Sequence, residues 1–184
     1  MAETPSNMIP LGTIAPDFEL FDTVSKNKRT LTELKSPKGT VIMFLCNHCP
    51  YVKLIQSALV STAREYQDKG IHFIAISSND ATTYPQDGPD KMHDEAKNNH
   101  YTFPYLYDDT QEIAKKYQAA CTPDFYVFDK DLKCIYRGRF DDATPGNGKP
   151  VTGKELKSAL DNHIAGKPVD INQHPSVGCN IKWK

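Results

Sequence analysis

A run of five hydrophobic residues, 41–45, is followed within a few positions by a helical pattern. The run is typical of a strand that is buried on both faces in the middle of a sheet. From Pro50 onward, hydrophobic residues recur at spacings of three and four, which predicts a helix over residues 50–69 that ends at Gly70. Residues 71–77 predict a second buried strand. A gap of about one helix between two such strands indicates a βαβ crossover, so the strands should pair in parallel.

The rest of the chain predicts short strands and helices around this unit. Asp109 and Glu112 resemble a capping box at the start of a helix, and Thr152 and Glu155 resemble the cap of a last helix. Further segments are an extended piece at 15–20, a polar loop at 79–89, a polar helix at 90–98, a short edge strand at 103–107 and an antiparallel hairpin at 125–128 and 133–137.

This order predicts an α/β fold in which a central mixed sheet carries helices on both faces. A length of 184 residues favours a single domain, which we place over residues 1–184. Residues 1–16 are rich in proline and are expected to form a loose lead-in.

Composition and charge narrow the class of protein. The 22 Lys and Arg against 23 Asp and Glu leave a formal charge of −1, which indicates neither nucleic acid nor an anionic membrane as a partner. No apolar run approaches the roughly 20 residues that span a bilayer, and the first ten residues lack the pattern of a signal peptide. Five cysteines in such a chain favour a reducing compartment, so we expect a cytoplasmic protein with catalytic cysteines.

Cys46 and Cys49 lie between the first predicted strand and its helix, separated by Asn47 and His48. The strand places them at the carboxyl edge of the sheet, where open α/β sheets carry their sites. The helix start directs unpaired N–H groups and a positive dipole end at the sulfurs, which favours a thiolate. Such a setting can lower a cysteine pKa from roughly 8.5 to about 3.5–7.5. Strand, C-x-x-C and helix in this order indicate dithiol–disulfide chemistry.

Two other interpretations of this pair were weighed against redox chemistry. The cysteines could be half of a zinc site, because C-x-x-C is also a common metal motif. No second C-x-x-C or H-x-x-x-H follows, so Cys121, His174 or Cys179 would have to supply the remaining ligands. Two buried core cysteines are disfavoured, because both residues lie at an element junction.

The order of elements, with C-N-H-C at 46–49 and T-P at 122–123, resembles the thioredoxin fold. Four segments are similar to the peroxiredoxin-like AhpC/TSA group: A-P-D-F-E-L at 15–20, C-T-P-D-F-Y-V-F-D at 121–129, Y-R-G-R-F-D-D at 136–142 and P-S-V-G-C-N-I-K-W-K at 175–184. The last resembles the ending of a subfamily that carries C-x-x-C. The resemblance implies a thioredoxin fold with an N-terminal extension and a C-terminal tail, residues 166–184, packed on the domain.

The resemblance also implies roles for individual residues. Cys46 would be the exposed attacking thiol, and Cys49 the buried thiol that resolves the mixed disulfide. The Thr122–Pro123 bond would be cis, with the backbone of Thr122 beside the cysteines to bind an extended substrate strand. His48 matches the C-P-H-C style of strong disulfide oxidants, in which a histidine stabilises the thiolate; the alternative is a solvated loop histidine without a role.

The chain departs from the pattern of both families. Thioredoxins usually carry a buried aspartate in the strand before the cysteines, where this chain has Thr40, so the usual proton acceptor is missing. Peroxiredoxins use P-x-x-x-T-x-x-C and an arginine on a later strand. If Cys49 takes the peroxidatic place, Ile42 and Cys46 replace the proline and the threonine. Arg137 is then the candidate for the arginine, although a surface ion pair explains it as well.

The other cysteines have different expected roles. Cys121 precedes Thr122 and should lie near the pair, either as a third redox participant or as a small buried hydrophobe. Cys134, inside a hairpin strand, is expected to be inert. We hypothesise that Cys179, in the tail, links to the active site, with an unrelated role as the alternative. Trp183 suggests that the tail docks, because its apolar area is large.

The leading hypothesis is a thiol–disulfide oxidoreductase in which Cys46 and Cys49 react, His48 tunes the thiolate, and Thr122 and Pro123 shape the substrate groove. Expected partners are protein or small thiol and disulfide substrates or a thioredoxin-type reductant, and no cofactor or metal is expected. The alternatives are a thiol-dependent peroxidase that uses Cys49, recycled through Cys46 or a tail cysteine, and a non-catalytic zinc-binding or protein-binding module.

Overall fold

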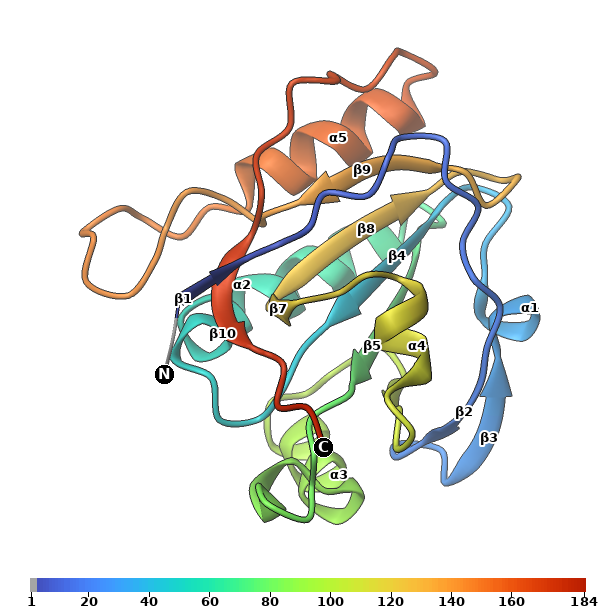
Figure 1. Ribbon diagram of the computed structural model, residues 1–184. Helices are drawn as coiled ribbons and strands as arrows, with labels where there is room; N and C mark the ends of the chain where they lie inside the picture. Colours follow the sequence, from blue (N-terminus) through green and yellow to red (C-terminus); the bar gives the residue numbers. More distant parts are fainter. Residues whose placement is uncertain (1–2) are drawn as a thin grey trace.

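Seven strands form the central sheet of the computed structural model, which describes residues 3–184 (Figure 1). Their order across the sheet is β3–β2–β6–β5–β4–β8–β9. β4, β5 and β6 are parallel, whereas β8 and β9 form an antiparallel hairpin beside β4, and β2 and β3 an antiparallel pair beside β6. The strands span β2 Glu19–Asp22, β3 Asn27–Thr30, β4 Thr40–Phe44, β5 His72–Ser77, β6 Tyr105–Tyr107, β8 Asp124–Phe128 and β9 Cys134–Gly138. The predicted parallel pair and the predicted hairpin are therefore confirmed.

Helices cover both faces of this sheet. The buried residues of the helices and the strands form two hydrophobic cores, one on each face. Alternate side chains of β4 point to opposite faces, so Val41 and Met43 pack in one core and Ile42 and Phe44 in the other. The first core lies under α2 (Pro50–Gln67), α3 (Pro89–Asn98) and α5 (Lys154–Ile164), and the second under α1 (Leu31–Leu34) and α4 (Glu112–Lys116).

The helix α4 begins differently from the prediction. Asp108, not Asp109, caps it: the buried Asp108 carboxylate accepts the backbone N–H groups of Ile113 and Ala114, at 3.3 and 2.9 Å. Asp109 is exposed and pairs with Lys184 at 3.1 Å. The capping box predicted from the spacing of Asp109 is wrong, because the neighbouring acid is the one that turns inward.

The start of α5 also differs from the prediction. Gly153 is the N-cap residue, with a φ of +67° that favours glycine. Thr152 accepts the N–H of Lys154 at 3.2 Å, and Glu155 forms an ion pair with Arg139 rather than closing a capping box.

A second, three-stranded sheet joins the two ends of the described chain. Its order is β1 (Glu3–Pro5), β10 (Val177–Asn180) and β7 (Cys121–Thr122), all antiparallel, and Figure 1 shows β1 and β10 side by side near the start of α2. The predicted loose lead-in is therefore wrong for residues 3–5, and residues 1–2 lie outside the described part. In the tail, Ile181 is buried while Trp183 is 43% exposed, so smaller side chains, and not the tryptophan, hold the tail in place.

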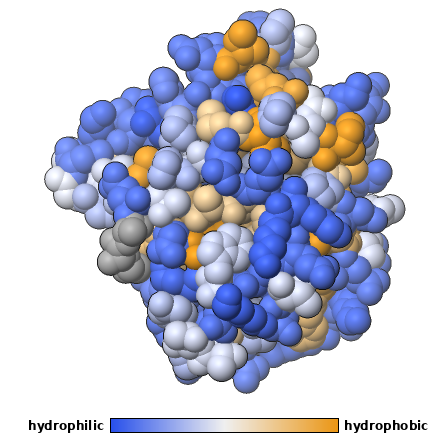
Figure 2. Space-filling model, viewed as in Figure 1, coloured by the Kyte–Doolittle hydropathy of each residue, from blue (hydrophilic) through white to orange (hydrophobic). Residues whose placement is uncertain are grey.

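On the face shown in Figure 2, polar residues predominate and hydrophobic ones form scattered patches. Among residues 3–184, no helix combines the length and the hydropathy needed to cross a membrane.

Candidate redox site

The two cysteines of the C-x-x-C lie where β4 gives way to α2. Cys46 comes two residues after the end of β4, and Cys49 is the N-cap residue of α2, with Pro50 in the first turn. Both are buried, with exposed fractions of 1% for Cys46 and 0% for Cys49. The expectation of an exposed Cys46 is therefore wrong, because other segments of the chain cover the junction.

Thr122 contacts both sulfurs. The Thr122–Pro123 peptide bond is cis, as the resemblance implied. The Thr122 hydroxyl oxygen lies 3.3 Å from Cys46 Sγ, and its carbonyl oxygen lies 3.4 Å from Cys49 Sγ. The structure thus brings together Cys46, Cys49, Thr122 and Pro123, four of the residues selected from the sequence.

The backbone of Thr122 is already paired with the tail of the same chain. Cys179 of β10 is the register partner of Thr122. The neighbouring Gly178 approaches so closely that a Cβ atom there would lie 1.9 Å from the Thr122 carbonyl oxygen. The edge expected to bind an extended substrate is therefore occupied by β10, whose Cys179 is buried beside Cys49.

Cys49 is the sulfur better placed to carry negative charge. The Cys46 thiol donates a hydrogen bond to it, and further donors are the Cys179 thiol and the backbone N–H groups of Val52 and Cys179. Together they outweigh burial and lower the pKa of Cys49 to about 5. The N–H of Val52 belongs to the first turn of α2, whose N–H groups have no partner inside the helix.

Cys46 behaves in the opposite way. Its hydrogen bond to Cys49, its burial and the negative charge of Asp87 raise the pKa of the Cys46 thiol. The two sulfurs therefore share one proton, which stays on Cys46 while Cys49 carries the charge. The sequence-based expectation that the helix start favours a thiolate holds for the second cysteine of the motif rather than the first.

His48 is in contact with a buried acid. Its Nδ1 lies 2.6 Å from an Asp87 carboxylate oxygen, and its ring stacks on Tyr84 with 5.7 Å between the ring centroids. Asp87 is completely buried at the end of the 3₁₀ helix Pro85–Asp87. Sequence reasoning missed Asp87, because a single acid in a polar loop carries no periodic signal. The only available signal is that its loop follows β5, the parallel neighbour of β4.

Possible metal donors also meet at this place. Within residues 3–184, one group of three such side chains, Cys46, His48 and Asp87, has its donor atoms within 4.8 Å of one another. Two ligands of a tetrahedral zinc ion are about 3.3 Å apart at bond lengths of about 2.0–2.1 Å. The 2.6 Å between His48 and Asp87 is shorter, which fits a direct contact better than two ligands around an ion. His174, weighed as a zinc ligand, lies 3.9 Å from Glu155 instead.

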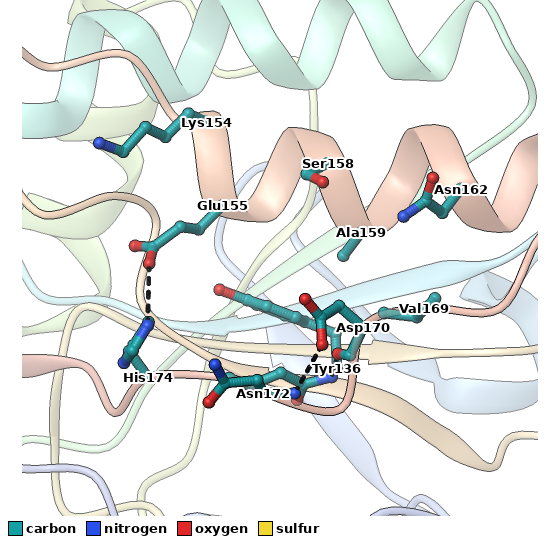
Figure 3. A pocket seen from close by; sticks show the side chains of 11 residues that line it. Tyr136, Lys154, Glu155, Ser158, Ala159, Asn162, Val169, Asp170, Asn172 and His174 are labelled. Atoms are coloured by element: carbon teal, nitrogen blue, oxygen red, sulfur yellow. Dashed lines mark hydrogen bonds and ion pairs between the residues drawn. The ribbon is translucent and has the colours of Figure 1, made fainter.

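Two of the surface hollows differ in their relation to the cysteines. One of about 280 Å³ lies between α5 and the segment 169–174, and no cysteine lines it (Figure 3). The smaller borders the redox site, because Tyr51, Pro123 and Val177 line it together with Arg139.

A family model described as the AhpC/TSA family matches residues 11–137, more than half of the chain. The chain belongs to this family. It is similar to an uncharacterized conserved protein from Geobacillus kaustophilus, with 55% identity, a TM-score of 0.98 and coverage of 100% of this chain and 97% of the other. It is also similar to a hypothetical protein from Sinorhizobium meliloti 1021, with 47% identity, a TM-score of 0.95 and 98% coverage of both chains. No curated protein matches the sequence.

More distant structures agree with the predicted fold. The thioredoxin domain of a thiol-disulfide oxidoreductase from Bacteroides vulgatus is 17% identical, with a TM-score of 0.61 over 73% of this chain and 91% of that domain. The predicted thioredoxin fold, with a central mixed sheet flanked by helices, is confirmed.

The guanidinium of Arg137, the candidate for a peroxidatic arginine, is bound to two other segments of the chain. It donates to the carbonyl oxygen of Ile9 at 2.7 Å and to the side chain of Gln173 at 2.8 Å. It therefore ties the N-terminal segment to the tail. Burial raises the pKa of Cys134 to about 12 and that of Cys121 further, so neither thiol is primed to react.

Proposed function

We propose that this AhpC/TSA protein is a thiol–disulfide oxidoreductase that exchanges a Cys46–Cys49 dithiol or disulfide with protein or small thiol substrates. The observation that carries the proposal is the placement of both sulfurs against Thr122 at the junction of β4 and α2, with Cys46 Sγ 3.3 Å from its hydroxyl and Cys49 Sγ 3.4 Å from its carbonyl oxygen. It supports the proposal because two thiols held beside one residue are close neighbours, and because a thiolate, which the lowered pKa of Cys49 favours, is the nucleophile in disulfide exchange.

The charge on Cys49 supports an order of steps in which Cys49 attacks first. The Cys49 thiolate forms a bond to one sulfur of a substrate disulfide, and the other substrate sulfur leaves with the electron pair. Cys46 then loses its proton and attacks Cys49, which forms the Cys46–Cys49 disulfide and releases the second substrate thiol. The same steps in reverse oxidise a dithiol substrate. This order exchanges the roles that the resemblance implied for the two cysteines.

Cys179 is the proposed second partner of Cys49. Its thiol donates to Cys49 in the closed structure, and the backbone N–H of Tyr51 points at its sulfur. A Cys49–Cys179 disulfide would pass oxidising equivalents between the site and the tail. A thioredoxin-type reductant in a reducing compartment such as the cytoplasm would restore the free thiols.

Peptide mapping after mild oxidation and alkylation tests the proposal. The wild type should give a reversible disulfide between Cys46 and Cys49, and the Cys46→Ser variant should give one between Cys49 and Cys179. Cys134→Ser is the matched control and should behave as the wild type. Reduction of insulin by the wild type, abolished in Cys49→Ser, would support the activity. If no Cys46–Cys49 disulfide forms under any oxidant, the proposal is wrong.

A thiol-dependent peroxidase is the second candidate, because the pKa of about 5 keeps Cys49 ionised at neutral pH. The position of Arg137 speaks against fast peroxide chemistry, since that arginine is bound elsewhere. Rapid consumption of hydrogen peroxide that is lost in Cys49→Ser and kept in Cys134→Ser would favour the peroxidase over the oxidoreductase.

A further inference from the structure

We propose that His48 and Asp87 form the proton path of Cys46: His48 accepts and returns the proton, and Asp87 is the positioning residue that holds the imidazole. This inference rests on the proposed function, because it concerns the step in which Cys46 joins Cys49.

Asp87 is built into the site as a fixed hydrogen-bond acceptor. It is completely buried, and its carboxylate accepts the backbone N–H of Asn47 and the side-chain amide of Asn79, both at 2.8 Å. Asn47 lies between the cysteines, so the carboxylate is anchored to the C-x-x-C itself. The side-chain amide oxygen of Asn79 accepts the backbone N–H of Lys182, which adds the tail to the same network. A buried carboxylate held by several donors keeps its geometry while the sulfurs react.

His48 connects this acid with solvent. Its Nδ1 is buried and lies 2.6 Å from the Asp87 carboxylate, whereas the side chain as a whole is 20% exposed. A histidine held against a carboxylate through one ring nitrogen keeps the other ring nitrogen as a proton acceptor. One ligand atom each of His48, Asp87 and Cys46 lies within 4.8 Å of the other two, so the imidazole is close enough to Cys46 for proton transfer through one bridging water.

The disulfide-forming step needs such an acceptor. When Cys46 attacks the mixed disulfide on Cys49, a Cys46–Cys49 bond forms and the bond from Cys49 to the substrate sulfur breaks. The electron pair leaves on the substrate sulfur. The proton of Cys46 must leave as well, and it cannot go to Cys49, whose sulfur is then covalently bound. His48 takes this proton and passes it to the departing sulfur or to water.

The other groups around Cys46 are poor acceptors. Burial raises the pKa of Tyr101 to about 12 and that of Tyr105 further, so both phenols are already protonated. The hydroxyl of Thr122, 3.3 Å from Cys46 Sγ, is not a base. Tyr84 stacks on His48, and Nζ of Lys182 lies 5.9 Å from the centre of the Tyr84 ring. Thioredoxins usually carry an aspartate where this chain has Thr40, and in this proposal His48 and Asp87, which come from other segments, take over its role as proton acceptor.

The test follows the two phases in which reduced full-length protein reacts with an aromatic disulfide reagent under stopped flow. The first phase is attack by Cys49, and the second is closure by Cys46, which the double variant Cys46→Ser, Cys179→Ser abolishes because Cys179 can then no longer close on Cys49 instead. We expect Asp87→Asn and His48→Gln to slow closure by about 10²-fold near neutral pH, as for loss of a general base, with the first phase nearly unchanged. The difference in closure rate between these variants and the wild type should narrow as the pH rises, because hydroxide then removes the Cys46 proton. Asp90→Asn, an exposed acid three residues away, is the matched control.

Chemical rescue separates proton transfer from a structural effect. Added imidazole should restore closure in His48→Ala, a variant that leaves the bonds of Asp87 to Asn47 and Asn79 in place and serves if Asp87→Asn does not fold. The inference is overturned if the variants close more slowly by the same factor at every pH and imidazole does not restore the rate. It is also overturned if they close at the wild-type rate. Absence of both phases in the wild type would instead overturn the proposed function.

Discussion

Cys179 lies opposite Thr122 across the antiparallel pair of β10 and β7, in the position where the resemblance implied an extended substrate. The chain thus fills its own substrate edge with a strand that carries a thiol. Because Cys46 and Cys49 are at most 1% exposed, a substrate of the proposed reaction would reach them only when β10 moves aside or when it enters from the hollow beside Pro123.

Gly178→Ala should open the site. A Cβ atom at this position would lie 1.9 Å from the Thr122 carbonyl oxygen, so β10 has to move away. Overpacking of this kind costs about 1–3 kcal/mol, which raises the population of the open form about 5-fold to 150-fold. We expect faster alkylation of Cys46 and Cys49, measured by mass spectrometry. Gly146→Ala is the control: an added Cβ there meets nothing within 4 Å, and the strain that alanine takes at a φ of +82° lies in a loop away from β10, so this variant should alkylate as the wild type does.

The ultraviolet absorbance of the thiolate should titrate with a midpoint near pH 5 in the reduced protein, because the pKa of Cys49 is lowered to about 5. Since the hydrogen bond from Cys46 is the largest cause, Cys46→Ala should move the midpoint upward, and Cys49→Ser should remove this transition. Cys134→Ser should change nothing below pH 9, because burial raises the pKa of Cys134 to about 12. A transition near pH 5 that survives in Cys49→Ser would assign the charge to another sulfur.

Two adjacent acids should differ sharply in their contribution to stability. Asp108→Ala removes the cap of α4 and leaves the buried N–H groups of Ile113 and Ala114 without a partner, at a cost of about 2–4 kcal/mol. Asp109→Ala removes an exposed ion pair and should change the free energy of unfolding by at most about 0.5 kcal/mol. Urea unfolding of the two variants measures the contrast, and equal losses would contradict the assignment of the cap.

Asp124 should make the protein less stable as the pH rises through neutrality. Burial raises its pKa to about 7, although the Tyr126 hydroxyl donates to it at 2.9 Å. The folded protein keeps this proton between about pH 4 and 7, where the unfolded chain has lost it. The stabilising contribution is therefore complete below pH 4 and declines as the pH rises through 7, by up to about 4 kcal/mol.

Asp124→Asn should remove that decline. Urea unfolding at pH 5 and pH 8 gives the free energies of unfolding of the wild type and the variant. The cysteines titrate in both proteins, so their effect cancels in the difference between the two free energies at each pH. The variant should gain stability relative to the wild type on going from pH 5 to pH 8. A constant difference would show that Asp124 does not titrate in this range.

The sequence predicted the elements whose side chains repeat with a clear period. Residues 41–45 are apolar without interruption, and the helix over residues 50–67 shows its buried face at spacings of three and four, so the junction that holds the cysteines could be located. The strand Glu3–Pro5 could not, because its short polar segment is ordered only by pairing with β10, more than 170 residues away. Asp87 and Asp108 are buried by tertiary contacts, and nothing in their local sequence separates them from exposed acids.

Cys49 is buried beside Cys179 of β10, and this has a consequence for synthesis. The cysteine motif at 46–49 is synthesised well before Val177–Asn180. At about 5–20 residues per second, the interval is on the order of ten seconds. During translation every new molecule therefore passes through a stage in which its reactive sulfurs are uncovered and open to capture by small thiols or oxidants.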